Sequence, residues 1–418
     1  IASGGNYNVV VGDEAGTALT TGDNNTAVGY AALDANTTAL NNTAVGYASL
    51  GANTTASNNT AVGTSALLAN TTGDSNVAVG KSALTANTTA ADNTAVGRSA
   101  LLANTTGASN TAVGKDALLA NTTADNNTAV GYTAGAAVTT GIRNTLIGSE
   151  AGDAITTGAN NVAVGALALT ADTLGSKSVA IGRGALRDQN FTSATDSHNI
   201  AVGYSAGQSV TTGVNNTIVG GLAGDAITTG DYNVALGMTT LSTNTAANKN
   251  VAIGAQALAD FNVTSDTDTY NVAVGYAAGA AVTTGTFNTL IGGLAGDAIT
   301  TGIRNTAVGQ QSFSTNTTGG LNTALGRSAL FSNTTASNNT AVGYEALYAN
   351  TTGAENVAVG AYAGDAITTG VHNVAVGTYA LTANTTGSQN VAIGRSSLEA
   401  NTTASNNTAV GNHALLAN

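Results

Sequence analysis

Side chains that could carry out chemistry are few in this chain of 418 residues. The three histidines, His198, His372 and His413, stand far apart in the sequence with no partner in common. Neither the ligand spacing of a zinc site nor the pairing of a nucleophile with a base occurs. The chain has no cysteine, so disulfides and thiol chemistry are excluded. We therefore expect a protein that is not an enzyme and needs no cofactor.

One segment has the residue types of a weak calcium site. Asp266 and Asp268 alternate with threonine and serine in the run Thr-Ser-Asp-Thr-Asp-Thr. Carboxylate and hydroxyl oxygens are the ligands that calcium prefers. The corresponding segment earlier in the chain keeps only Asp196. A calcium site is one interpretation of this segment, and a solvated polar loop is the other.

Six tyrosines directly follow a recurring glycine and are the candidates for a binding surface. The residues at this position in other copies include Lys, Arg, Thr, Ser, Gln and Asn, and such tolerance predicts that the position faces solvent. Exposed tyrosines could contact a glycan or a partner surface. The six are Tyr30, Tyr47, Tyr132, Tyr204, Tyr276 and Tyr344.

The recurring glycine marks a strict repeat, represented by Asn-Thr-Ala-Val-Gly at 42–46. It occurs 24 times, and consecutive copies are 17 residues apart. Only the steps that follow Gly182 and Gly254 differ, with 21 residues each. A short fixed period is typical of a solenoid, in which each turn stacks on its neighbours.

The repeat predicts an all-β fold, a parallel β-solenoid (β-roll or β-helix) of 17-residue turns. We expect one continuous domain of about 24 turns over 1–418, with four-residue insertions within 183–202 and 255–274. The chain begins and ends within the repeat pattern. We therefore expect it to be a fragment of a longer chain.

A short strand is expected just before each glycine, which is numbered position 0. Position −1 is Val, Ile or Leu and position −3 is Thr, Val or Ile in every copy, and the two share one face of an extended segment. We expect the group at −1 to fill a thin core together with one large apolar residue at +4 or +7. The columns expected from this pattern include Gly29, Gly46, Gly63, Val28, Val45 and Val62.

Position −4 is asparagine in 23 of the 24 copies, with Ser178 as the exception. In a stack of turns the amides would form a column, and each could donate to the next. The alternative is a simple preference of asparagine for turns. The first members of the expected ladder are Asn25, Asn42, Asn59, Asn76 and Asn93.

A large apolar residue alternates between two positions of the other half of the turn. Where +4 is large, as in Leu50, position +7 is usually asparagine; where +4 is glycine, as in Gly152, position +7 is apolar, as in Ile155. Such an exchange conserves core volume, so both positions should point into the same core. Positions +8 and +9 are mostly Thr-Thr, which raises the hypothesis of an ice-binding array of hydroxyl and methyl groups.

Charge and composition exclude some functions. The net charge of −12 and pI of about 4.3 argue against nucleic-acid binding, which needs a basic surface. No apolar run is long enough for membrane insertion. Because the core is thin, we expect Ala-rich faces to be buried between chains of a homo-oligomeric fibre; a single-chain solenoid is the alternative. Aspartates at position +5 are expected to be exposed and to aid solubility: Asp153, Asp225, Asp297 and Asp365.

The repeat Asn-Thr-Ala-Val-Gly-Tyr-x-Ala-Leu-x-x-Asn-Thr-Thr resembles the shaft repeats of phage tail-fibre-like and bacterial surface fibre proteins of the endosialidase-chaperone type. The run from Ser178 to Gly182, Ser-Val-Ala-Ile-Gly, is also similar to the β-roll head of trimeric autotransporter adhesins. The resemblance covers the entire chain, although each turn is longer than in the adhesin head. It implies an elongated, usually trimeric fibre outside the cell.

The resemblance leads to a functional hypothesis. The chain would be the structural shaft of an extracellular fibre or adhesin, on a virion or a bacterial cell surface, that projects an attachment element. It would self-associate, with a trimer favoured, and reach a host or prey surface. The alternative is a module that binds a glycan or a surface directly through the exposed tyrosines or the insertions, and an ice-binding solenoid is a third hypothesis.

Overall fold

The computed structural model describes residues 5–416. It confirms the predicted fold class, because these residues form a parallel β-solenoid of 17-residue turns without a helix. The chain divides into two compact units, which meet in sequence between Thr212 and Gly213. The expectation of one continuous domain stays a prediction.

Each unit contains twelve three-residue strands in its described part, one for each turn. In the first unit they are β1 (Val9–Val11), β2 (Thr26–Val28), β3 (Thr43–Val45), β4 (Thr60–Val62), β5 (Val77–Val79), β6 (Thr94–Val96), β7 (Thr111–Val113), β8 (Thr128–Val130), β9 (Thr145–Ile147), β10 (Val162–Val164), β12 (Val179–Ile181) and β14 (Ile200–Val202). In the second unit they are β15 (Thr217–Val219), β16 (Val234–Leu236), β18 (Val251–Ile253), β20 (Val272–Val274), β21 (Thr289–Ile291), β22 (Thr306–Val308), β23 (Thr323–Leu325), β24 (Thr340–Val342), β25 (Val357–Val359), β26 (Val374–Val376), β27 (Val391–Ile393) and β28 (Thr408–Val410).

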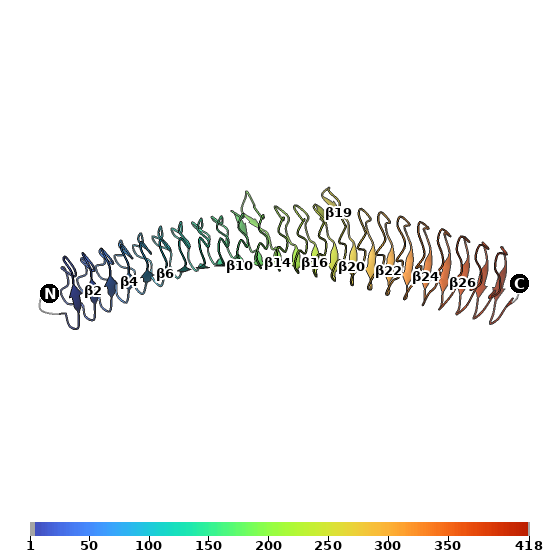
Figure 1. Cartoon of the computed structure of the whole chain (residues 1–418), viewed down its shortest axis with the longest axis horizontal. Coiled ribbons are helices and arrows are strands. Elements are labelled where there is room, and N and C mark those ends of the chain that lie inside the picture. Colours follow the sequence, from blue (N-terminus) through green and yellow to red (C-terminus); the bar gives the residue numbers. More distant parts are fainter. Residues whose placement is uncertain (1–4, 417–418) are drawn as a thin grey trace. The chain divides into compact units, whose positions relative to one another are not determined.

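Within each unit, strands of successive turns lie side by side and pair in parallel, position for position (Figure 1). Ala27 pairs with Ala44, and Ala44 with Ala61. The register survives the 21-residue turn of the first unit, where Ala180 still pairs with Ala201. Equivalent side chains therefore form straight columns, and neighbouring strands in such a sheet lie about 4.8 Å apart.

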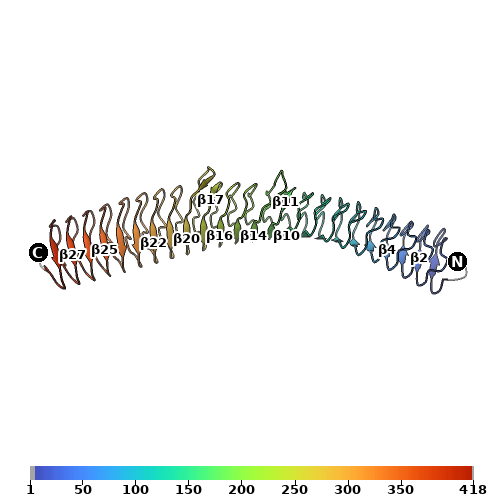
Figure 2. The same ribbon diagram turned by 180° about the vertical axis from the view of Figure 1, so that it is seen from behind.

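Each four-residue insertion adds a small second sheet to its unit. In the first unit β11 (Gly175–Ser176) pairs with β13 (Thr195–Asp196), and in the second β17 (Ala247–Asn248) pairs with β19 (Thr267–Asp268). Figure 2 shows β11 and β17 at the end of their turns that lies opposite the main strands. The extra residues therefore leave the main sheet of each unit undisturbed.

The core is built from alanine, leucine and asparagine, and one expectation about it was wrong. The alanine at −2 is buried, as in Ala44, whereas Val28, Val45 and Val62 at −1 are half-exposed on the outer face of the sheet. The narrow space inside one turn fits a methyl group next to Leu50, so the larger β-branched groups point outward. Ala-rich faces are consequently buried inside each chain and are not free to pack between chains.

The exchange between +4 and +7 is confirmed and has a further physical basis in the backbone. Leu50 and Asn53 are both fully buried, as is Ile155 in a turn of the other type. Position +4 has a left-handed conformation in both types, with φ of 50° at Leu50 and 55° at Gly152. Leucine adopts this region only with strain, and glycine adopts it freely. The glycine-type turn therefore relieves backbone strain while the residue at +7 keeps the core filled.

The glycine at position 0 is required for a different reason. Its φ is 135° at Gly46, in a region that disfavours side chains, and a Cβ added there would lie 2.6 Å from the carbonyl oxygen of Gly63. The same contact recurs from turn to turn, for example between Gly29 and Gly46. Backbones of successive turns thus touch along this column, and only glycine fits between them.

Two adjacent glycines allow a test of this contact. We expect Gly292→Ala to destabilise its turn by about 3 kcal/mol or more, because φ is 135° and the new Cβ would lie 2.5 Å from the carbonyl oxygen of Gly309. Gly293→Ala should be nearly neutral, because a Cβ there meets no atom within 4 Å. Hydrogen exchange resolves individual turns in a repeat protein. Amides of β20–β22 should exchange faster in the first variant only, and equal exchange in both would refute the contact.

Candidate functional site

The asparagine column at −4 lies in the interior of each unit. Asn25, Asn42, Asn59, Asn76 and Asn93 are at most 1% exposed. The Oδ1 of Asn42 accepts the backbone N–H of Asn59 at 2.9 Å, and its Nδ2 donates to the carbonyl oxygen of Ala56 at 2.9 Å. The side-chain amides therefore connect successive turns by hydrogen bonds to backbone groups. Only a few of them donate to the side-chain amide of the neighbouring turn, as Asn110 does to Asn93.

A second asparagine column, at +7, forms a ladder in which side-chain amides of successive turns hydrogen-bond to one another. Asn70 Nδ2 donates to Asn53 Oδ1 at 3.1 Å, Asn87 to Asn70 at 2.9 Å, and Asn104 to Asn87 at 2.9 Å. Sequence reasoning used these residues only as the partners of the large group at +4. Their regular recurrence was the available signal, but a polar residue is not normally expected in a core this thin.

The exception in the −4 column is compensated by its neighbours. Ser178 is too short to replace an asparagine, and the longer Gln189 reaches in, donating from Nε2 to Ser178 Oγ at 2.8 Å and to Asp172 Oδ2 at 2.7 Å. Burial raises the pKa of the Asp172 carboxyl, while the hydrogen bonds from Gln189 and from the backbone of Gly175 act in the opposite direction. A buried polar group that is hydrogen-bonded throughout is tolerated in a core.

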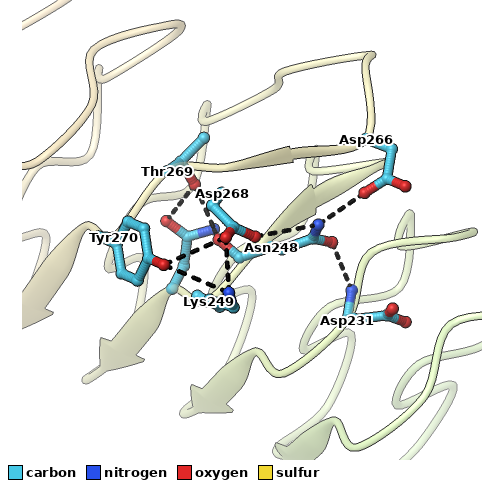
Figure 3. Close-up of polar contacts among 8 residues, drawn as sticks. Asp231, Asn248, Lys249, Asp266, Asp268, Thr269 and Tyr270 are labelled. Carbon is cyan, nitrogen blue, oxygen red and sulfur yellow. Dashed lines mark hydrogen bonds and ion pairs between the residues drawn. The ribbon is translucent and has the colours of Figure 1, made fainter.

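The insertion of the second unit places the calcium candidates beside a cation (Figure 3). Asp268 lies 2.5 Å from Lys249 Nζ and accepts a hydrogen bond from the Tyr270 hydroxyl at 3.1 Å. Asp266 accepts from Asn248 Nδ2 at 2.7 Å. The hydrogen bond from Lys249 lowers the pKa of Asp268, and the same bond raises the pKa of Lys249. Lys249 would have to leave before a calcium ion could bind Asp268.

The equivalent insertion of the first unit repeats this ion pair. Lys177 Nζ lies 2.5 Å from Asp196. In each unit a lysine therefore forms an ion pair with an aspartate of the insertion. Over residues 5–416, no group of three or more His, Cys, Asp or Glu side chains is arranged to hold a metal ion. The three histidines are not brought together, and His372 lies beside Glu355, with 3.0 Å between Nδ1 and Oε2.

The tyrosines at +1 are exposed, but a neighbouring ring or cation covers one ring face of five of the six. Tyr30 and Tyr47 stack with centroids 5.3 Å apart and planes 15° apart. A hydrogen bond with Glu14 raises the pKa of Tyr30 to about 12. Lys115 lies over Tyr132 at 5.0 Å and Arg183 over Tyr204 at 5.8 Å.

Two other tyrosines at +1 differ in how their rings are covered. Arg327 lies over Tyr344 at 5.6 Å. Tyr276 is 60% exposed and, within the part of the chain that the structure describes, has no aromatic or cationic neighbour over its ring. Stacked rings show their edges to solvent, whereas a sugar stacks on a ring face. Most of this column therefore reinforces the contact between turns.

A second aromatic column, at −5, was not identified from the sequence. Lys249 lies over the ring of Tyr270 at 5.3 Å, Tyr270 stacks on Phe287 at 5.8 Å, and Arg304 lies over Phe287 at 5.7 Å. The four residues are spaced by the repeat, which was the available signal. Two stacked rings thus lie between two cations, and such contacts stabilise adjacent turns.

The expectation that the aspartates at +5 are exposed was wrong, because Asp153, Asp225, Asp297 and Asp365 are all half-buried. Burial raises the pKa of Asp225, Asp297 and Asp365, which are half-buried against the next turn. Asp297 and Asp365 accept hydrogen bonds from the hydroxyls of Ser314 and Thr382. Asp225 lacks such a donor: its Oδ1 is buried and has no hydrogen-bond partner among the described residues.

Loss of an asparagine at −4 should destabilise a turn with glycine at +4 more than a turn with leucine at +4. Asn144→Ala should destabilise its turn by about 2–5 kcal/mol, because it leaves the N–H of Asn161 and the carbonyl of Gly158 without partners. Asn42→Ala should cost about 1–3 kcal/mol, because the carbonyl of Ala56 keeps its bond from Asn53. Local hydrogen exchange measures both, with the exposed Asn41→Ser as the control. Equal costs would contradict the assigned hydrogen bonds.

The raised pKa of Asp225 predicts that the effect of replacing it on stability depends on pH. In the unfolded chain this carboxyl ionises near its ordinary pKa of 3.8, and in the folded chain only at a higher pH. Wild type therefore loses stability as the pH rises through that interval, and below it both states are protonated. Asp225→Asn should raise the unfolding midpoint at pH 7 but not at pH 3. Asp92→Asn removes the same charge from an exposed position and should shift neither midpoint; an equal rise at both pH values would refute the assignment.

Neither a pocket nor a membrane-spanning helix occurs in residues 5–416. Comparison with known proteins does not indicate a function. No protein-family model matches the chain, and a search of curated proteins finds no match. Support for a function must therefore come from the columns of side chains on the surface of the turns.

Proposed function

We propose that the chain is a non-enzymatic structural shaft of an extracellular fibre or adhesin, which holds an attachment element away from a virion or bacterial surface. In this proposal, copies of the chain associate side by side, with a trimer favoured. The observation that carries it is the outer face of the main sheet. This face is formed by positions −3 and −1 and is called the valine–threonine face.

The valine–threonine face has no charge in either column. All 24 residues at −1 are Val, Ile or Leu, and all 24 at −3 are Thr, Val or Ile. They are half-exposed or exposed, as Val45 and Ile147 illustrate, the latter at 38%. In a chain with a net charge of −12, the absence of charge from both columns suggests that this face is covered by a partner. Monomeric soluble proteins usually expose contiguous apolar patches of no more than roughly a few hundred Å².

The straightness of the columns favours a second copy of the chain as the cover. A partner that packs on one turn can pack in the same way on each following turn, so weak contacts add along a unit. Self-association through one repeated patch also leads naturally to closed cyclic symmetry. The resemblance to fibre shafts and trimeric adhesins supports three copies and a location outside the cell.

Two other functions receive less support from the geometry. Direct glycan binding through the tyrosines at +1 is weakened because five of the six rings have one face covered by a neighbouring ring or cation. Ice binding through Thr-Thr is weakened because the hydroxyl at +8 bonds the backbone of the next turn, as Thr37 does to Thr54 at 3.2 Å. The valine–threonine face itself is regular and partly hydroxylated, so thermal hysteresis at high protein concentration remains the test of ice binding.

Charge placed on the valine–threonine face should prevent assembly. We expect wild type to show an oligomeric mass by light scattering, and the triple variant Val28→Lys, Val45→Lys and Val62→Lys to shift toward the monomer. The reason is that three ammonium groups would have to be desolvated within the interface. Added charges on an exposed sheet face should leave the fold intact, which circular dichroism checks.

A control variant tests whether a lysine added outside the valine–threonine face also disturbs assembly. Tyr47→Lys places a lysine at +1, where Lys81 stands in a later turn, and should leave the oligomer intact. A wild-type monomer at all concentrations, or a triple variant that assembles normally, would overturn the proposal. A monomer that shows thermal hysteresis would instead indicate that the valine–threonine face binds ice.

A further inference from the structure

Cations are concentrated in one column of the solenoid. Position +1, called the corner column, directly follows the glycine at the end of each main strand. It holds six of the 11 Lys and Arg residues of the chain but one of its 23 Asp and Glu residues, Asp13. Three of the six occur in consecutive turns of the first unit. These three, Lys81, Arg98 and Lys115, are called the basic run, and all are exposed.

The backbone fixes the spacing of the basic run. Ser99 N–H donates to the carbonyl of Lys81 at 3.0 Å, and Asp116 N–H to that of Arg98 at 2.9 Å. Successive cations are therefore held one turn apart, about 4.8 Å along the stack. The three cations stand in the turns that follow β5, β6 and β7, and like charges this close repel one another. The arrangement is unfavourable unless an external anion neutralises it.

Most other cations of the chain already have partners, which distinguishes the basic run. Lys177, Lys249 and Arg187 form ion pairs with aspartates. Arg183 and Arg327 hydrogen-bond to tyrosine hydroxyls. Over residues 5–416, by contrast, no carboxylate lies within 4.0 Å of Lys81 or Arg98.

Only one end of the run is partly neutralised. Lys115 lies 3.4 Å from Asp116, and its ammonium lies over the ring of Tyr132 at 5.0 Å. These contacts orient Lys115 without shielding its two neighbours. The run therefore presents at least two uncompensated charges in line, with the aromatic ring at its end.

We propose that the basic run binds a linear acidic polysaccharide that lies along the stack. Carboxylate or sulfate groups on successive sugars pair with Lys81, Arg98 and Lys115, because a sugar unit is comparable in length with one or two turns. Arg98 can bind such a group with two parallel hydrogen bonds, while the lysines act as point charges. This inference adds a lateral binding site to the proposed shaft and does not depend on its oligomeric state.

A nucleic acid fits the same run less well. Binding to single strands combines a long basic groove with free ring faces on which bases stack. The basic run covers three turns, and Lys115 covers a face of the ring at its end. The net charge of −12 repels every polyanion, an acidic polysaccharide included, so binding must come from local pairing with the basic run.

Binding of alginate to the full chain tests the proposal. Calorimetry at low salt should show binding of alginate to wild type, no binding of uncharged dextran, and weakening as salt rises. The triple variant Lys81→Gln, Arg98→Gln and Lys115→Gln should bind at least tenfold more weakly. The control variant Arg143→Gln, Arg183→Gln and Arg395→Gln removes the same charge from scattered turns and should bind within about twofold of wild type.

Three results would overturn the proposal. They are the absence of alginate binding by wild type, an equal loss of affinity in the control variant, and tighter binding of an oligothymidine of similar length than of alginate. The last would assign the run to nucleic acid. Unfolding midpoints of the two variants should match each other, since each loses one cation over a tyrosine ring, Lys115 over Tyr132 or Arg183 over Tyr204. Failure of the shaft proposal would show in the mass of the protein and not in this titration.

Discussion

Direct contact between the backbones of successive turns, at the glycine that ends each strand, is the constraint on which the structure depends. A Cβ at Gly46 would lie 2.6 Å from the next turn, so no other residue can occupy the column without moving the backbones apart. The contact fixes the spacing of the turns at that corner. Strand pairing, both asparagine columns and the aromatic stacks all follow from this spacing, because each joins equivalent positions of adjacent turns.

The same constraint explains where the chain can vary. Four extra residues are accepted at the end of the turn away from the main strands, where β11 with β13 and β17 with β19 form separate small sheets. Register in the main sheet of the first unit is unchanged across its insertion, as the pair of Val179 with Ile200 shows. Exposed positions such as +1 vary freely, so that charge and aromatic groups can gather in columns without affecting the core.

Much of the fold could be predicted from the sequence, because a 17-residue period sets the architecture and each strand has a β-branched residue at −3 and Val, Ile or Leu at −1. The side of the strand that faces inward could not. Size and hydrophobicity favoured valine over alanine for the core, and only the small volume enclosed by one turn reverses that choice. Buried asparagines at +7 were missed for a related reason: their burial depends on partners 17 residues away, which a single turn does not reveal.

The candidate sites were less predictable than the fold. Spacing placed the tyrosines at +1 on the surface, but whether a ring face is free depends on the residue one turn away, as the stack of Tyr30 on Tyr47 shows. Asp266 and Asp268 have the composition of a calcium site, whereas the proximity of Lys249 is a consequence of the insertion's path. Residue types alone do not specify these neighbours.

The most direct test of the account is which side of the strand is accessible. The chain has no cysteine, so single cysteines can be introduced at Ala44 and at Val45 and their thiol labelling rates compared. The account predicts slow labelling of Ala44→Cys under all conditions, because that position is fully buried. It predicts rapid labelling of Val45→Cys in dilute solution and protection at concentrations where copies associate. Rapid labelling of Ala44→Cys with permanent protection of Val45→Cys would contradict the inward-facing alanines and the exposed valine–threonine face.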